Sequence, residues 1–108
     1  MNSPIVTLNV VEVAADGSRI PIRVELDQPR PHERGGWACK VSVDGYDSFS
    51  HDVAGEDSLQ ALCLALRMVR FHLGRPLSRG SRLVYPDASG DLPLQAYFEE
   101  PLNESPSA

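Results

Sequence analysis

Residues 57–76, DSLQALCLALRMVRFHLGRP, determine the fold that the sequence predicts. Asp57 can cap the start of a helix while Gln60 reaches back from the third helical position. Gly74, followed by Pro76, can close the other end. Apolar residues recur at helical spacing between these signals. We therefore expect one long helix over residues 58–73.

The apolar side chains of this helix fall on two faces when they are placed at about 100° per residue. One stripe is expected to pack against a sheet and contains Leu59, Leu62, Leu66, Val69 and Leu73. A second apolar group lies on the far side and contains Leu64, Met68 and Phe71. The helix therefore needs a second partner.

The sequence leaves three partners open for that second face. The chain after Gly74 could fold back over it, bringing Leu77, Leu83, Tyr85, Leu92 and Leu94. A second copy could form a homodimer, because exposed apolar patches often mark interfaces. A different protein is the third candidate.

Alternating apolar and polar residues predict two β-hairpins before the helix. Each joins two strands across an Asp-Gly turn: residues 5–13 and 19–27 across Asp16-Gly17, and residues 37–44 and 46–53 across Asp44-Gly45. The adjacent Val10 and Val11 break the alternation and indicate a β-bulge near Val10. Pro21 predicts that its strand lies at a sheet edge or leaves that position unpaired.

The remaining segments complete an α+β domain. Residues 28–36 predict an exposed loop, residues 81–85 a late strand, and residues 92–98 an apolar segment of undefined form. The fold class is then an antiparallel sheet of four to five strands, two hairpins plus the late strand, packed against one long α-helix. We expect a single domain over residues 1–98 and a disordered acidic tail over residues 99–108.

Composition and charge narrow the functional classes. A chain of 108 residues with 42% hydrophobic and 23% charged residues should fold around one core. The sequence shows no membrane span and no secretion signal, and Cys39 and Cys63 are too few for a disulfide scaffold. We expect a cytoplasmic protein with reduced thiols. The net charge of −5 makes nucleic acid an unlikely partner by electrostatics.

The charge is distributed unevenly along the chain. Residues 67–82 lack Asp and Glu but contain Arg67, Arg70, Arg75, Arg79 and Arg82. Guanidinium groups can bind phosphate, so nucleic-acid or phosphate-ligand binding through this stretch is one alternative function. Arginines near a helix C-terminus also stabilise it directly, and the sequence favours that structural explanation.

The sequence contains no recognisable catalytic or metal-binding arrangement. His51 and Asp52 are neighbours in a predicted strand and should point to opposite faces. The candidate metal ligands lack the spacing of zinc sites: His32, His51, His72, Cys39 and Cys63. We expect no enzyme activity, no cofactor and no metal site.

The segment Gly55-Glu56-Asp57-Ser58-Leu59-Gln60-Ala61-Leu62, preceded by Trp37-Ala38-Cys39, resembles a family of small bacterial domains of unknown function. Members share a W-x-C strand, a G-x-D-S-L-Q-A-L helix start and a Gly-rich turn into a late strand, here residues 80–85. The resemblance covers residues 37–94. It implies an intact domain of bacterial origin and assigns no activity or active site.

The function that these observations favour is a non-enzymatic protein-interaction domain that self-associates through Leu64, Met68 and Phe71. An immunity-type protein that neutralises a basic toxin is an alternative. Its contact surface would be the acid-rich residues 44–57, including Asp47 and Asp52.

Overall fold

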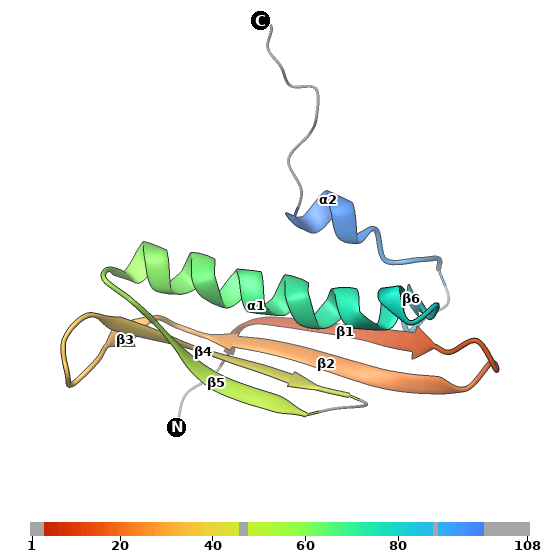
Figure 1. Cartoon of the computed structure of the whole chain (residues 1–108), viewed down its shortest axis with the longest axis horizontal. Coiled ribbons are helices and arrows are strands. Elements are labelled where there is room, and N and C mark those ends of the chain that lie inside the picture. The colour runs from red at the N-terminus through yellow and green to blue at the C-terminus, as the bar shows by residue number, and fades with distance from the viewer. Residues whose placement is uncertain (1–3, 46–47, 88, 99–108) are drawn as a thin grey trace, which may run out of the picture.

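The computed structural model describes residues 4–45, 48–87 and 89–98. A sheet forms one layer, the long helix α1 crosses one face of it, and the short helix α2 lies above the C-terminal half of α1 (Figure 1). The predicted α+β class is confirmed. The elements are β1 (Pro4–Val13), β2 (Arg19–Asp27), β3 (Arg30–Pro31), β4 (Trp37–Asp44), β5 (Phe49–Gly55), α1 (Ser58–Ser78), β6 (Arg82–Val84) and α2 (Leu94–Phe98).

Every strand pairing in the sheet is antiparallel. The two predicted hairpins, β1–β2 and β4–β5, join through β2 and β4, and the late strand β6 pairs with β1. The short β3 pairs with β4 inside residues 28–36, which the sequence predicted as a loop. The order across the sheet is therefore β5, β4, β2, β1, β6, and α1 connects its two edge strands.

The strand irregularities match the predictions only in part. β1 keeps a continuous register with β2 from Val6 to Val13, and a shift lies between Pro4 and Val6, so the bulge expected at Val10 is wrong. The inward row continues through Val10 to Glu12, a charged residue that the sequence pattern did not place in the core. Pro21 lies in an interior strand rather than at an edge, but the ladder with β4 begins only at Arg23, so the predicted alternative of an unpaired position holds on that side.

Two predictions reach beyond the described residues. The fourth predicted strand, residues 46–53, is observed as β5 from Phe49, and residues 46–47 lie outside the described part of the chain. The acidic tail expected at residues 99–108 also lies outside it.

α1 begins as predicted. The Asp57 carboxylate accepts a hydrogen bond from the Gln60 N–H at 2.7 Å. The Gln60 side-chain oxygen in turn accepts from the N–H of Glu56 at 2.7 Å. These bonds satisfy backbone donors that the first helical turn leaves without partners.

α1 continues to Ser78 and does not end at residue 73 as predicted. Pro76 lies in its last turn, where the missing N–H removes a single helical bond. Gly80, with φ of 88°, closes the helix. Its N–H reaches the Leu77 carbonyl at 3.1 Å, and the Ser81 N–H reaches the Pro76 carbonyl at 3.0 Å, the pair of bonds that defines a Schellman ending.

α1 contacts the sheet through small residues. The buried row is Ala61, Ala65, Val69, Leu73 and Pro76. Val69 and Leu73 belong to the stripe that the sequence predicted, but Leu59 is 68% exposed and Leu66 is 36% exposed. The predicted facing of the helix is therefore wrong for these two leucines.

The close approach of β5 to α1 explains this rotation. A β-carbon added at Gly55 would lie 2.5 Å from the backbone nitrogen of Ala61, so the two backbones leave no room for a side chain. Alanines permit this approach, whereas leucines at the same positions would hold the layers apart. Leu59 and Leu66 consequently point to the side of α1 and remain exposed.

The segment after β6 packs against the core, and α2 contacts α1. That this segment covers Leu64, Met68 and Phe71, one of the predicted alternatives, stays a prediction. Leu83 and Leu92 are buried in the core, and Leu94 and Phe98 pack against it. A bridge between Val84 and Asp91 extends the sheet before α2 begins.

A hydroxyl pair links this returning segment to α2. The hydroxyls of Tyr85 and Tyr97 lie 2.9 Å apart, and this hydrogen bond raises the pKa of Tyr85 above its ordinary value. The phenol of Tyr85 therefore stays protonated at neutral pH.

Gly55→Ala tests the close approach, with Gly74→Ala as the matched control. We expect Gly55→Ala to lower the free energy of unfolding by about 1–3 kcal/mol, because the new methyl group overlaps the α1 backbone. A β-carbon at Gly74 meets nothing within 4 Å, so Gly74→Ala should raise helix propensity and stability by up to about 1 kcal/mol. Urea denaturation measures both; equal effects would contradict the packing described.

Candidate functional site

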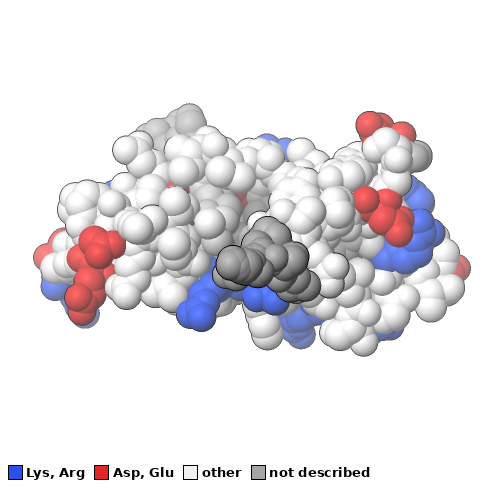
Figure 2. Space-filling model, turned by 90° about the horizontal axis from the view of Figure 1, so that it is seen from above, with Lys and Arg blue, Asp and Glu red and all other residues white. Residues whose placement is uncertain are grey.

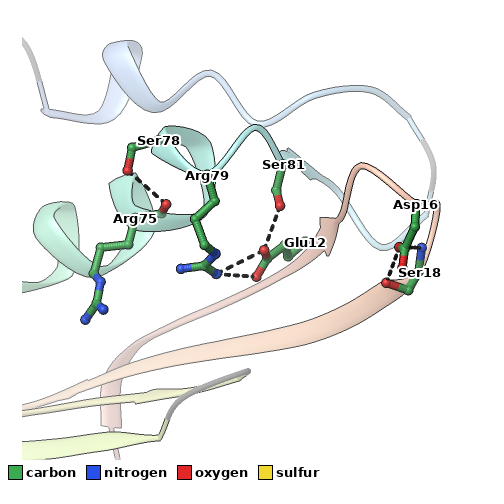
Figure 3. Close-up of polar contacts among 7 residues, drawn as sticks. All are labelled: Glu12, Asp16, Ser18, Arg75, Ser78, Arg79 and Ser81. Atoms are coloured by element: carbon green, nitrogen blue, oxygen red, sulfur yellow. Dashed lines mark hydrogen bonds and ion pairs between the residues drawn. The ribbon is translucent and has the colours of Figure 1, made fainter.

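A buried carboxylate lies beneath the C-terminal end of α1. Glu12 of β1 is 2% exposed. Its two oxygens accept hydrogen bonds from Nη2 of Arg79 at 3.2 and 3.1 Å, and Oγ of Ser81 donates at 2.8 Å (Figure 3). The charge is thus neutralised and its hydrogen bonds are supplied from the end of α1 and the residues that follow it.

The cavity beside this cluster is small. Its volume is about 30 Å³. It is lined by Glu12, Ile22, Val43, Gly45, His72, Arg75, Pro76 and Arg79. A space of this size holds one or two water molecules rather than an organic substrate. The cluster is therefore a structural link between α1 and β1.

The structure spreads the predicted anion-binding arginines over different surfaces. Arg79 turns inward to Glu12, whereas Arg82 pairs with Asp91 at 2.6 Å in solvent. The Arg75 guanidinium lies 5.8 Å from the centre of the Phe71 ring. Arg67 and Arg70 are exposed on α1. The stretch from residue 67 to residue 82 does not converge on one binding site.

Several acids of residues 44–57 already have partners. Asp44 accepts from Oγ of Ser48 at 2.7 Å, Asp57 caps α1, and Asp52 pairs with Arg30 at 2.9 Å. Asp47 lies outside the described residues. A surface hollow of about 460 Å³ in this region has mixed charge, being lined by Asp27, Arg30, Lys40, Ser50, His51 and Asp52.

The histidines and cysteines are dispersed over the fold, with Cys39 on β4, His51 on β5, and Cys63 and His72 more than two helical turns apart on α1. Asp52 binds Arg30 rather than its neighbour His51, and the His72 ring stacks on Phe49 with centroids 4.2 Å apart. Cys39 is buried and Cys63 is exposed. Burial raises the pKa of the Cys39 thiol. Within the described part of the chain, no three His, Cys, Asp or Glu side chains gather as metal ligands would.

The predicted interaction residues Leu64, Met68 and Phe71 differ in exposure. Leu64 and Met68 are half-buried, and Met68 packs against the core. Phe71 is 60% exposed, with its ring meeting His72 edge-on at 5.3 Å. This face is therefore partly covered by the protein's own side chains.

A more open apolar surface lies on the opposite side of α1. His72 meets β5 on one flank of the helix, so the leucines at the opposite helical angle face toward β1. We name this side the leucine flank; it consists of Leu59, Leu62, Leu66 and Leu77. Ile5 and Val6 of β1 are also exposed, at 51% and 44%. Figure 2 views the molecule from the side on which α1 and α2 lie, where uncharged residues predominate, most visible acidic groups lie toward the two ends, and basic groups also lie along the middle of one border.

Sequence reasoning missed this surface because it ranked helix faces by hydrophobicity. The available signal was the pair Ala61 and Ala65, one helical turn apart, together with Gly55 before the helix. Small residues at that spacing mark the side where two backbones can approach closely. The exposed leucines follow from that assignment.

The Glu12 cluster yields a stability test with an internal control. Arg79→Ala leaves a buried carboxylate with one hydroxyl donor, and we expect a loss of about 3–5 kcal/mol in unfolding free energy. Arg82→Ala removes a pair whose two side chains are both 63% exposed, so we expect a change of at most about 1 kcal/mol. Thermal or urea unfolding compares them; a similar small loss for both would show that the Glu12 pair is not structural.

None of the helices in the described part of the chain combines the length and apolar character needed to cross a bilayer. No curated protein and no solved structure matches the sequence. The sequence profile of a family described as Domain of unknown function (DUF6968) matches residues 9–96. That range includes β1 from Asn9 onward, the other strands and α1, in keeping with the resemblance to a small domain of unknown function. The chain therefore belongs to the DUF6968 family.

Proposed function

We propose that this chain is a protein-interaction domain that self-associates through the leucine flank of α1 and the exposed start of β1. The observation that carries the proposal is the exposure of large apolar side chains on both elements: Ile5, Val6, Leu59, Leu66 and Leu77. Grouped apolar side chains exposed on a protein surface commonly mark interaction sites.

The leucine flank is better suited to a partner than the face that contains Leu64 and Met68. Those two side chains are half-buried, and the Phe71 ring already contacts His72 and the Arg75 guanidinium. Leu59 has no comparable cover, being 68% exposed. A partner therefore gains more buried apolar area on the leucine flank.

The polar clusters of the structure support a role in binding rather than catalysis. Glu12 is occupied by Arg79 and Ser81, and its cavity is about 30 Å³. Asp52 is held by Arg30. In each case the charged group already has a structural partner.

When the chain self-associates, the apolar surface of one copy packs against the same surface of the other, so no different protein is needed to bury it. In a two-fold dimer each copy contributes the same patch, so each leucine position of the patch is buried in both copies. Full burial of a leucine side chain contributes about 1.5–3 kcal/mol. Further burial of Leu59 and Leu66 on both copies therefore contributes favourably to dimer formation.

Leu66→Asp tests the proposal, with Phe71→Asp as the matched control on the other side of α1. We expect the wild type to dimerise and Leu66→Asp to weaken the dimer at least about 100-fold, because a buried charge replaces a buried apolar group. Phe71→Asp should leave the dimer intact. Light scattering behind a sizing column, over a wide range of protein concentration, measures the mass.

Two results would count against this assignment. A wild-type monomer at every concentration would contradict self-association. A dimer that Phe71→Asp dissociates and Leu66→Asp leaves intact would move the contact to Leu64, Met68 and Phe71. Circular dichroism of both variants confirms that neither change unfolds the protein.

A further inference from the structure

One edge of β1 is open over most of its length. β2 pairs with β1 from Pro4 to Val13, but β6 covers the other edge only from Val11 to Val13. Among residues 4–45, 48–87 and 89–98, no strand pairs with that edge between Pro4 and Val10.

The hydrogen bonds of β6 show which backbone groups point toward this edge. The Leu83 carbonyl accepts from the Leu92 N–H at 2.9 Å, on the side of β6 that faces away from β1. Because backbone groups alternate along an antiparallel strand, it is the neighbours of Leu83 that bond to Val11 and Val13. Every second residue of β1 points its backbone groups to the same edge as Val11. Asn9 and Thr7 therefore present their N–H and C=O groups at the open edge.

This edge lacks the features that usually prevent strand association. Residues 4–11 contain no charged side chain. The opposite edge strand, β5, contains His51 and Asp52, both exposed. Proteins commonly protect free edges with charge, proline or a bulge, and β1 has only Pro4 and the nearby register shift at its far end.

We propose that the open edge of β1 pairs antiparallel with β1 of a second copy, so that one sheet runs through both. This inference rests on the proposed self-association and specifies its geometry. The two-fold axis lies at Thr7, which places Thr7 opposite Thr7 of the second copy and Val6 opposite Leu8. Antiparallel pairing of a strand with itself satisfies two-fold symmetry, and the open stretch from Pro4 to Val10 is centred on Thr7.

A second copy fits this edge better than an unrelated extended peptide. A second copy supplies a strand that matches this edge, because residues 4–11 of each copy carry no charge and Val6 of one copy lies opposite Leu8 of the other, on the face of the sheet that α1 covers. One partner then satisfies the open backbone edge and covers Val6, which is 44% exposed.

Disulfide trapping tests the register. In a Cys63→Ser background, Thr7→Cys places two thiols at facing positions with Cα atoms about 5.5 Å apart, within disulfide reach. Asn9→Cys is the matched control, because its two copies would lie about 14 Å apart in the same pairing. Under mild oxidation we expect covalent dimers from Thr7→Cys at a yield at least about ten times that of Asn9→Cys.

The outcomes separate this inference from the proposed function. A wild-type dimer by light scattering with selective trapping of Thr7→Cys supports both. A dimer in which Thr7→Cys forms no more disulfide than Asn9→Cys overturns edge pairing and leaves self-association standing. A wild-type monomer at every concentration overturns both.

Discussion

The close approach of α1 to the end of β5 is the constraint on which the rest of the structure depends. A β-carbon at Gly55 would lie 2.5 Å from the Ala61 nitrogen, so helix and strand meet backbone to backbone. Ala61 and Ala65 allow this contact, and their positions fix the rotation of α1 about its axis. The exposure of the leucine flank follows directly, because leucine side chains do not fit between α1 and β5 and therefore point to the side of the helix.

The far end of α1 is fixed by a different interaction. Glu12 receives hydrogen bonds from Arg79 and Ser81, and Gly80 between them ends the helix with the Schellman bonds. Gly55 of β5 and Glu12 of β1 thus hold the two ends of α1 to strands near opposite edges of the sheet. With both ends fixed, the exposure of the leucine flank is a property of the folded domain rather than of a loosely attached helix.

Sequence patterns predicted the positions of the helices and strands better than which side of each element is buried. Alternation and Asp-Gly turns gave the hairpins, and Asp57 with Gln60 gave the start of α1, because these signals act within a few residues. The end of α1, the burial of Glu12 and the exposure of Leu59 depend on residues far apart in the chain. Glu12 and Arg79 show this most clearly, since neither position indicates its partner in the sequence. The candidate surface was missed for the same reason, and only the spacing of Ala61 and Ala65 could have revealed it.

Exposed leucines on α1 and an open edge on β1 together define one side of the domain as an interface. Amide hydrogen exchange at Thr7 and Asn9, measured over a range of protein concentrations, tests this account most directly. These amides point away from β2, so they should exchange rapidly in dilute solution and become protected as the concentration rises. Rapid exchange at every concentration, in a protein whose β2 amides remain protected, would contradict it.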